Sequence, residues 1–324
     1  MFVSCLPHLN VQDQKVLETQ ICDAVKNLRW LQFMRSISVI CLSLIILGAF
    51  GSVVFSLGAA QSLQSSVFTI PTRSGVTVKT LFVPPNGASS AVLVLFVGDT
   101  GLQAFSQQGD QITYSASFMS RTTPLFLAQG YSVLLVNAPS DHPIGMSRDF
   151  RQGSANAQDI SMIIDFLLSK SLKPIFLVGT SLGTMSVNDF ASTYSKDNRV
   201  SGIVLTSTVT ANLQVQNIAI PVLFVHNLYD ACSESPYQSA VDFSKKFTGS
   251  PKVDFIKVQD KVNDIADPCG PLSGHGYGGI ESEVIKDITN WTTQVLSVNQ
   301  SNAINPTMLL ITTLENRNCE TDLA

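Results

Sequence analysis

A serine between two glycines is the feature of this sequence that most directly indicates chemistry. The pentapeptide Gly179–Gly183, which reads GTSLG, follows the apolar run Pro174–Val178 and leads into the helical stretch Leu182–Tyr194. Between a strand and a helix, the pattern G-x-S-x-G is typical of a turn that presents a nucleophilic serine, here Ser181. The glycines leave space where strand and helix crowd each other, and the helix N-terminus favours developing negative charge. The alternative is a serine that only caps a tight turn.

A serine hydroxyl is a poor nucleophile at neutral pH and needs a general base. Three histidines follow residue 60, and the last of them, His275, lies in a glycine-flanked loop before the final helical stretch. Such a loop lets an imidazole reach across the edge of a sheet. His142 and His226 come too early for the chain order serine, acid, histidine, so we interpret both as structural residues. The alternative for His275 is a histidine on a surface loop.

The imidazole in turn needs a carboxylate that orients it and stabilises its cation. Asp230 lies four residues after the apolar run Pro221–His226, where the chain order puts the acid. Other acidic residues nearby remain alternatives, namely Glu234, Asp260, Asp264 and Asp267. We predict that Ser181, Asp230 and His275 form a catalytic triad.

Acyl transfer also needs two backbone amides aimed at the carbonyl oxygen of the substrate, an oxyanion hole. We expect one amide from Leu182, the residue after the nucleophile. We expect the other from the glycine-rich loop 98–102, with Asp99 as the first candidate and Thr100 as the second. A carboxylate beside an oxyanion is unfavourable, so the Asp99 side chain must turn away. The alternative is an ordinary turn between a strand and a helix.

Eight short runs rich in β-branched and apolar residues are candidates for the strands that position these groups. They are Val67–Ile70, Val76–Val83, Ala91–Val97, Tyr131–Asn137, Pro174–Val178, Gly202–Thr206, Pro221–His226 and Val253–Val258. The middle runs are apolar without interruption, which indicates burial on both faces, as in a parallel sheet covered by helices. We therefore predict the α/β class, with an eight-stranded, mostly parallel sheet and helices on both faces.

Helical stretches alternate with the later runs, as expected for units of strand, helix and strand. They are Ala155–Ser169, Leu182–Tyr194, Tyr237–Phe247 and Ile280–Leu296. The first three runs have no helix between them, which predicts an antiparallel meander at the start of the sheet. A weaker helical stretch, Phe118–Gln129, is interrupted by Pro124.

Specificity must come from loops, because the connection Ser207–Ile220 is too short for a large cap domain. We expect the loops 101–117 and 138–154 to surround the substrate. Tyr229 is a candidate for one wall of the site.

An uncharged, mostly apolar stretch at residues 37–60 follows Arg29 and Arg35. It is long enough to cross a bilayer as a helix, and the basic residues before it put the N-terminus in the cytoplasm. It also fits a signal peptide that starts at Met34 and is cleaved after Ala60. We therefore expect an exported domain that is periplasmic or secreted, or anchored to the membrane through residues 37–60 alone. A buried core helix is the remaining alternative.

The composition limits the classes of partner. The 324 residues are 45% hydrophobic and 14% charged, with a net charge of −4. A packed core is therefore expected, and the slight acidity argues against nucleic acid. The sequence has neither paired CxxC motifs nor HExxH, so we expect no metal, and the triad chemistry needs no cofactor.

The predicted organisation is an extension at 1–33, a signal peptide or anchor at 34–60, the catalytic domain at 61–299 and a tail at 300–324.

From about residue 66 to residue 297 the sequence resembles the α/β-hydrolase superfamily. In that superfamily the nucleophilic serine in its turn between strand and helix (the nucleophile elbow), the acid and the histidine follow in this order. It is more closely similar to exported bacterial α/β-hydrolases that are described as dienelactone-hydrolase-like. The stretches that carry this similarity are Val136–His142, Gly179–Thr184, Asp230–Cys232 and Asp267–Gly276. The resemblance implies the fold, the triad roles and export, without a defined substrate.

Two departures from these relatives bear on what the resemblance implies. Many members of the superfamily have His-Gly at the oxyanion loop, where this chain has Val97-Gly98. True dienelactone hydrolases use a cysteine nucleophile, whereas this chain has Ser181. Their substrate therefore does not carry over.

Cysteines lie beside both the proposed acid and the proposed base. Cys232 is two residues after Asp230, and Cys269 is six residues before His275. We hypothesise that a disulfide between them joins the loop that carries Asp230 (the acid loop) to the loop that carries His275 (the base loop). An oxidising compartment permits such a bond. Cys319 would then be unpaired. The alternative is two reduced core thiols.

Together these features predict a serine hydrolase of the carboxylesterase type, acting on small or medium esters or related acyl compounds through an acyl-enzyme intermediate. Its partner would be a small-molecule ester or acyl substrate. One alternative is an acyltransferase that uses the same triad with an alcohol in place of water. Another is a non-catalytic binding protein with the same fold.

Overall fold

The computed structural model describes the chain from residue 64 to residue 315, apart from residues 103, 109–110, 212, 214, 216–217 and 260–265. From residue 299 onward only the backbone is described. Gln61–Ala303 form one compact unit. The predicted extension, the predicted signal or anchor segment and Cys319 lie outside the described residues. Among the helices of the described residues, none combines the length and the apolar character needed to span a membrane.

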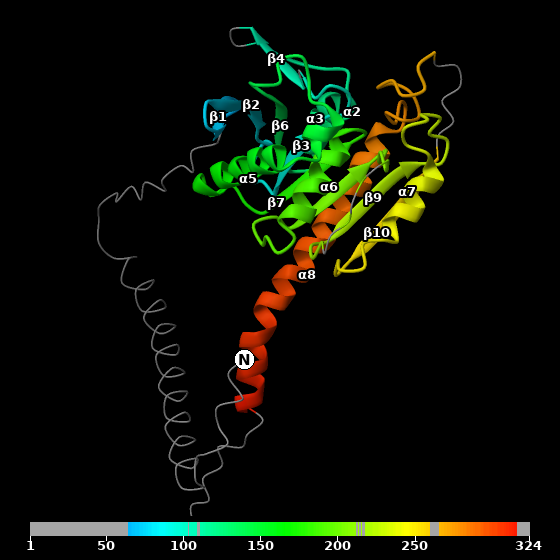
Figure 1. The fold of residues 1–324 in the computed structure, drawn as a ribbon. Helices are drawn as coiled ribbons and strands as arrows, with labels where there is room; N and C mark the ends of the chain where they lie inside the picture. The colour runs from blue at the N-terminus through cyan, green and yellow to red at the C-terminus, as the bar shows by residue number, and fades with distance from the viewer. Residues whose placement is uncertain are drawn as a thin grey trace, which may run out of the picture. The chain divides into compact units, whose positions relative to one another are not determined.

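An eight-stranded sheet forms the centre of this unit (Figure 1). Its strands are β1 (Ser66–Arg73), β2 (Val76–Val83), β3 (Val92–Phe96), β6 (Ser132–Pro139), β7 (Ile175–Thr180), β8 (Gly202–Thr206), β9 (Val222–Asn227) and β10 (Val253–Val258). Across the sheet they lie in the order β1-β2-β6-β3-β7-β8-β9-β10. From β6 to β10 in that order all neighbours are parallel, whereas β1 and β2 are antiparallel to their neighbours. The predicted eight-stranded, mostly parallel sheet is confirmed.

The predicted antiparallel meander is right for the first two runs, because β1 and β2 pair antiparallel, but wrong for the third. β2 pairs antiparallel with β6 rather than with β3. β3 lies between β6 and β7 and is parallel to both. Every residue of β3 is buried, as expected for a strand covered on both faces, whereas β1 carries exposed residues and lies at the edge. Burial on both faces therefore puts β3 at the centre, although it follows β2 in the sequence.

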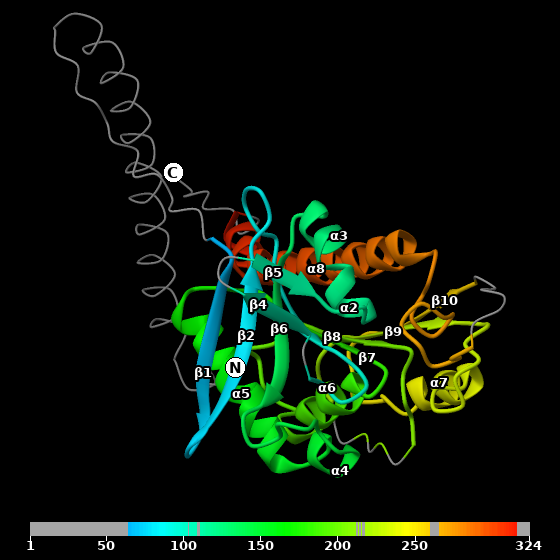
Figure 2. The same ribbon diagram turned by 90° about the horizontal axis from the view of Figure 1, so that it is seen from above.

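Helices cover both faces of the sheet (Figure 2). One face carries α4 (Arg148–Arg151), α5 (Ser154–Ser169), α6 (Gly183–Thr193) and α7 (Tyr237–Ser244), and the other carries α2 (Phe118–Arg121), α3 (Thr123–Ala128) and α8 (Glu281–Glu315). Each face has its own hydrophobic layer. Ile164 of α5 and Val187 of α6 belong to the first layer, and Phe126 of α3 and Trp291 of α8 belong to the second. The sheet therefore stands between two cores that hold its strand ends in place.

One weak helical stretch is interrupted near Pro124 as predicted, and two further features differ from the sequence prediction. Pro124 divides the stretch Phe118–Gln129 into α2 and α3, and it lies in the first turn of α3, where proline is well tolerated. α8 runs on to Glu315 instead of ending near Leu296. A hairpin of β4 (Phe105–Gln108) and β5 (Gln111–Tyr114) forms a second, two-stranded sheet that the sequence pattern does not predict. The connection from β8 to β9 contains neither helix nor strand among its described residues.

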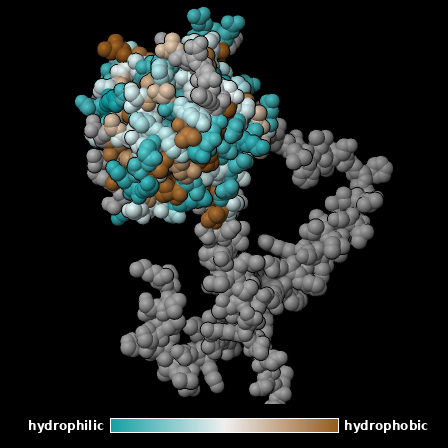
Figure 3. Space-filling view, turned by 90° about the vertical axis from the view of Figure 1, so that its right-hand side faces the viewer, coloured by the Kyte–Doolittle hydropathy of each residue, from teal (hydrophilic) through white to brown (hydrophobic). Residues whose placement is uncertain are grey.

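Hydrophilic residues are interspersed with smaller hydrophobic spots on the face shown in Figure 3. Single large apolar side chains are exposed in the described domain, for example those of Ile144 and Leu272. Single exposed apolar residues are normal for a soluble surface. Among the described residues, most large apolar side chains belong to the two layers against the sheet.

Candidate active site

Ser181 follows the last residue of β7 and precedes α6, in a turn that few residues other than glycine adopt. Its φ is 51°, in the left-handed region. The backbone of the turn is held on both sides, because the Ser181 amide donates to the Thr206 carbonyl at 3.0 Å and the Ser181 carbonyl accepts from the Thr184 amide at 2.9 Å. A side chain held in such a strained turn, beside a helix N-terminus, is the geometry of a nucleophile elbow.

The glycines around Ser181 are required by space. A Cβ on Gly179 would lie 2.7 Å from the carbonyl oxygen of Gly183. A Cβ on Gly183 would collide with the carbonyl oxygen of Phe96, on the neighbouring strand β3. A Cβ on Gly98 would lie 2.7 Å from the Cβ of Ser181. Strand, elbow and helix thus meet at backbone distance, and the predicted steric reason for the GTSLG pattern holds.

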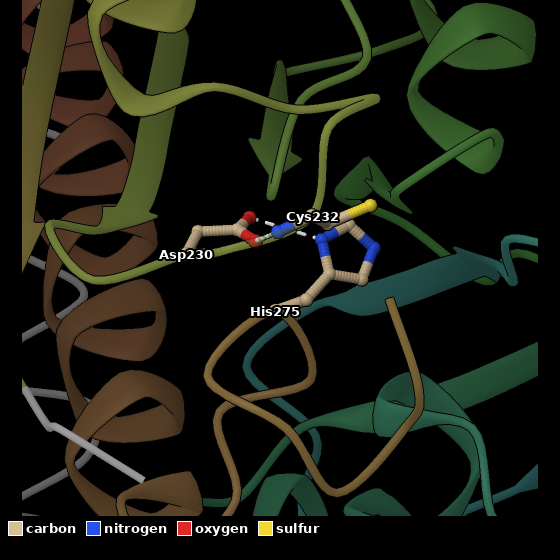
Figure 4. Close-up of side chains that lie close together, drawn as sticks. All are labelled: Asp230, Cys232 and His275. Atoms are coloured by element: carbon tan, nitrogen blue, oxygen red, sulfur yellow. Dashed lines mark hydrogen bonds and ion pairs between the residues drawn. The ribbon is translucent and has the colours of Figure 1, made fainter. Parts of the chain in front are cut away.

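Asp230 and His275 lie side by side, although 45 residues separate them in the sequence (Figure 4). The Nδ1 atom of His275 lies 2.9 Å from the Oδ2 atom of Asp230. Asp230 comes from the loop after β9, and His275 comes from the loop between β10 and α8. The side chains of Asp230 and His275 are 0% and 5% exposed. A carboxylate beside Nδ1 favours the tautomer that carries its proton on that atom, which leaves Nε2 without a proton.

Contacts to β8 and β9 fix the base loop. The Ser207 hydroxyl donates to the His275 carbonyl at 2.6 Å. The hydroxyl of the fully buried Tyr277 donates to the Val225 carbonyl at 2.7 Å and accepts from the Ser207 amide at 2.9 Å. The residues next to the imidazole are therefore bonded directly to the end of the sheet.

Ser235 and His226 complete the surroundings of the Asp230 carboxylate, and the sequence prediction gives neither of them that role. The Ser235 hydroxyl donates to Oδ2 of Asp230 at 2.8 Å and also lies 2.8 Å from Nδ1 of His275. The Nε2 atom of His226 lies 2.9 Å from the Ser235 carbonyl and 3.4 Å from Oδ2 of Asp230. The Cys232 amide donates to the other carboxylate oxygen at 2.9 Å. Both carboxylate oxygens are thus bonded.

These contacts keep the acid ionised. Burial alone would raise the pKa of the Asp230 carboxyl, but hydrogen bonds from His226 and His275 outweigh it and hold that pKa well below its usual value. The electrostatic influence of the adjacent His275 ring lowers the pKa of the Asp230 carboxyl further. Asp230 is therefore a carboxylate at neutral pH, as an acid that stabilises an imidazolium must be.

Ser181 and His275 line one cavity of about 240 Å³ at the carboxyl ends of the parallel strands. Its lining residues are Val97, Gly98, Asp99, Thr100, Leu102, Ser115, Ser117, Phe118, Thr180, Ser181, Cys269, Pro271, His275 and Gly276. The Nε2 atom of His275 is buried and has no hydrogen-bond partner among the described residues. Both Ser181 and His275 thus border the same cavity.

The loop predicted to supply the oxyanion hole also borders this cavity. Asp99 and Thr100 line it, and Asp99 has a φ of 46°. Within the described part of the chain, the amides of Asp99, Thr100 and Leu182 have no hydrogen-bond acceptor. The oxyanion roles of Leu182 and Asp99 stay predictions, and these amides have the freedom such donors need.

Several other residues considered from the sequence lie away from the cavity. His142 contacts Asp141 at 2.9 Å and lies against the ring of Phe150. Glu234 pairs with Arg148 at 2.7 Å. The Asp267 carboxylate accepts the Cys269 amide at 3.0 Å, and Asp260 and Asp264 lie outside the described residues.

The expected specificity elements need a correction. Leu102, Ser115 and Ser117 of the loop 101–117 do line the cavity, but neither Tyr229 nor any residue of 138–154 does. The loop 138–154 instead contacts the loop 98–102, which we call the oxyanion loop after its predicted role. The Met146 amide donates to the Thr100 carbonyl at 2.8 Å. The segment 269–276 takes its place as a wall.

A disulfide joins Cys232 to Cys269 and so links the acid loop to the base loop. Asp230, Cys232 and His275 also form the single group of three metal-ligating side chains found in the described residues. The Cys232 sulfur is already bonded to Cys269, so it is not a thiolate. We therefore interpret this group as an acid–base pair beside a disulfide.

Solved structures with a similar fold are α/β-hydrolases. An alpha-beta serine hydrolase homologue from Coxiella burnetii has 14% sequence identity and a TM-score of 0.51, and the match covers 70% of this chain and 97% of that one. The Pyrococcus furiosus esterase Pf2001 has 13% identity and a TM-score of 0.52, with 72% and 93% covered. Est1E from Butyrivibrio proteoclasticus, solved with ferulic acid, has 13% identity and a TM-score of 0.50, with 71% and 99% covered.

The sequence itself matches no protein-family model and no curated protein. What the structural matches show is the fold: this chain has the α/β-hydrolase fold, as the sequence resemblance implies. The closer similarity to exported dienelactone-hydrolase-like proteins stays a prediction.

Proposed function

We propose that this protein is a serine hydrolase that cleaves carboxylic esters or related small acyl compounds through the triad Ser181, Asp230 and His275. One observation carries the proposal. Ser181, in its left-handed turn, lines the same cavity as His275, whose Nδ1 lies 2.9 Å from the Asp230 carboxylate. A nucleophile, a base and an acid that orients the base are the parts that acyl transfer requires.

In the first half of the reaction, the Ser181 hydroxyl oxygen attacks the acyl carbon while His275 Nε2 takes its proton. The carbonyl oxygen becomes an oxyanion, to which the amides of Leu182 and Asp99 donate. The imidazolium, stabilised by Asp230, then protonates the leaving alcohol, and the acyl group remains on Ser181.

In the second half, His275 takes a proton from water, and the resulting hydroxide oxygen bonds to the acyl carbon. The carbon–oxygen bond to Ser181 breaks, His275 returns the proton to the serine, and the acid leaves. Every proton in this scheme passes through Nε2, so the lack of another partner for that atom in the described residues supports it.

The cavity supports a small acyl group as substrate. Its volume of about 240 Å³ is below the usual range of drug-sized ligand sites. Leu102, Phe118 and Pro271 give it apolar surface, and Ser115 and Ser117 give it hydroxyl groups. Esters with short acyl chains fit this combination best.

We also propose that the enzyme acts outside the cytoplasm. Disulfides persist mainly in oxidising compartments, and the Cys232–Cys269 bond supports export. Cell fractionation of the tagged full-length chain tests this, and recovery of the protein in the cytoplasm with both thiols free would contradict it.

The test of the activity is labelling with a fluorophosphonate probe, followed by hydrolysis of chromogenic esters of graded acyl length. We expect Ser181 to be labelled and short acyl esters to be cleaved. Ser181→Ala should abolish both, whereas the matched control Ser169→Ala, at the exposed end of α5, should change neither.

Two outcomes would contradict the proposal in different ways. Labelled protein that passes its acyl group only to added alcohols, and never to water, is an acyltransferase. Folded wild-type protein that is not labelled is a binding protein with this fold.

A further inference from the structure

A buried guanidinium lies behind the loop that borders the cavity. Arg151 ends the short helix α4 and is 0% exposed. Charged side chains are almost never fully buried unless they are paired, yet no carboxylate forms an ion pair with Arg151 among the described residues. Burial lowers the pKa of the guanidinium to about 10, against the opposing influence of Asp99, so Arg151 remains a cation at neutral pH.

The contacts of Arg151 converge on the oxyanion loop. Its Nη2 atom donates to the Asp99 carbonyl at 3.0 Å and lies 3.5 Å from the Gly98 carbonyl. Its Nη1 atom donates to the Ser186 hydroxyl at 3.3 Å. A Cβ on Gly101 would lie 2.7 Å from Nη2, so the loop passes the guanidinium at close range. The cation is therefore bonded mainly to two backbone carbonyls of this loop.

These two carbonyls determine where two amides point. In a trans peptide, the carbonyl of one residue and the amide of the next lie in one plane and point in opposite directions. The Gly98 carbonyl shares its plane with the Asp99 amide, and the Asp99 carbonyl shares its plane with the Thr100 amide. Since Arg151 holds both carbonyls on its own side, both amides face the other way.

Backbone amides bond to three carbonyls of the same loop. The Gly98 carbonyl accepts the Gly101 amide at 3.0 Å, the Thr100 carbonyl accepts the Met146 amide at 2.8 Å, and the Gly101 carbonyl accepts the Ala138 amide at 2.8 Å. Hydrogen bonds in a chain polarise one another, and charge acts more strongly in a water-poor interior. A cation on the Asp99 carbonyl therefore makes the Thr100 amide a stronger donor.

We propose that Arg151 is a positioning residue for the oxyanion hole: its buried guanidinium holds the Gly98 and Asp99 carbonyls so that the Asp99 and Thr100 amides face the acyl oxygen. This inference rests on the proposed serine hydrolase function. In this inference the Thr100 amide is a donor together with the Asp99 amide. The loop 138–154 contributes to catalysis through Arg151, without contact to the substrate. Arg151 acts through the loop and touches no reacting atom.

The test compares two variants. Arg151→Met removes the charge but keeps an unbranched side chain, whereas Arg151→Lys keeps the charge but loses the two Nη donors of the guanidinium. The control is Arg199→Met. Arg199 precedes β8, at the opposite end of the sheet from the cavity, and bonds to Asp165 of α5 and to Asp197. Each variant is assayed with a short chromogenic ester and with butylboronic acid, and the active fraction is titrated with the fluorophosphonate.

Butylboronic acid reports on the oxyanion hole directly. The Ser181 oxygen bonds to boron, its proton passes to His275, and a tetrahedral anion results. We expect Arg151→Met to lower kcat about 10- to 100-fold per active site, with KM within about threefold, and to weaken boronate inhibition by a similar factor. Arg151→Lys should fall between wild type and Arg151→Met, and Arg199→Met should lower Tm without changing kcat.

The outcomes separate this inference from the proposed function. If Arg151→Met changes kcat and boronate inhibition no more than Arg199→Met does, the inference is wrong and the function stands. If Arg151→Met does not fold, Arg151→Lys decides, and a kcat and boronate affinity equal to wild type overturn the inference. If wild-type Ser181 neither reacts with the fluorophosphonate nor cleaves esters, both fail.

Discussion

The two halves of the candidate site are held together in different ways. On the nucleophile side, β3, β7 and α6 meet at backbone distance, and the glycines at 98, 179 and 183 are the residues that permit it. On the acid–base side, two long loops are joined by side chains, with Ser235 between Asp230 and His275 and a disulfide nearby. One half is shaped by backbone crowding and the other by hydrogen bonds.

This difference predicts opposite sensitivities. The nucleophile side should tolerate no added atoms, because a methyl group there meets a carbonyl or Ser181 itself. The acid–base side should suffer from lost atoms, because a buried polar group that loses its partner is costly. The variants below test each half, from the largest expected effect on activity to the smallest.

Asp230→Asn should have the largest effect of the four. An amide cannot stabilise the imidazolium and can bind the wrong tautomer of His275, so kcat should fall about 10³- to 10⁴-fold. Steady-state ester hydrolysis measures this. Glu234→Gln is the matched control, since Glu234 pairs with Arg148 away from the cavity, and should stay close to wild type. A larger loss in Glu234→Gln would mean that the acid is misassigned.

Gly98→Ala adds one methyl group to the nucleophile side. Its Cβ would lie 2.7 Å from the Cβ of Ser181 and 3.2 Å from the hydroxyl oxygen, so loop and serine must separate. A misplacement on this scale costs about 10²-fold, which kcat/KM for a short ester would show. Gly75→Ala is the contrast: it has open space but a φ of 71°, so it should cost about 1 kcal/mol of stability and leave kcat/KM unchanged. Equal kcat/KM in both variants would contradict the crowding argument.

Ser235→Ala removes one atom from the acid–base side. The carboxylate loses a hydrogen bond of 2.8 Å, and Nδ1 of His275 loses its second neighbour, so kcat should fall about tenfold. The control is Ser244→Ala, whose hydroxyl bonds to the Val241 carbonyl and to nothing else among the described residues. If Ser235→Ala lowers Tm but not kcat, Ser235 serves only the fold.

The double variant Cys232→Ala/Cys269→Ala should affect stability more than activity. The disulfide closes a loop across a sequence separation of 37, and losing it should cost about 4 kcal/mol on the chain-entropy account. The hydrogen bonds around Asp230 remain, so kcat should change by less than about threefold. Chemical denaturation and ester hydrolysis measure the two effects. A collapse of kcat in fully folded protein would assign the disulfide to the triad geometry itself.

The parts of the molecule that the sequence predicts well are those with a local pattern. The elbow at Ser181 is such a case, because strand, pentapeptide and helix are contiguous. All eight candidate strands of the main sheet occur, since each is a short apolar run. The pairing of β2 with β6 is not local, and here the prediction fails. The hairpin of β4 and β5 is not predicted because each strand has only four residues, and FSQQ contains a single apolar residue.

The residues that support the candidate site are not predicted from the sequence, for a different reason. Ser235, His226 and Arg151 have no motif, and each gains its role only when distant segments meet. His226 could be placed after a strand, but its contact with Asp230 depends on how the acid loop turns back. A fully buried arginine gives no sequence signal, because arginine is normally a surface residue.

The cavity has a further consequence for how such a protein could diversify. Its floor comes from the ends of β3 and β7, whereas Leu102, Ser115 and Pro271 stand on segments outside the main sheet. Exchanging those segments would alter which acyl groups are admitted while leaving the reactive serine where it is. Laboratory evolution aimed at residues 102–117 and 269–273 should therefore shift chain-length preference without rebuilding the reactive centre.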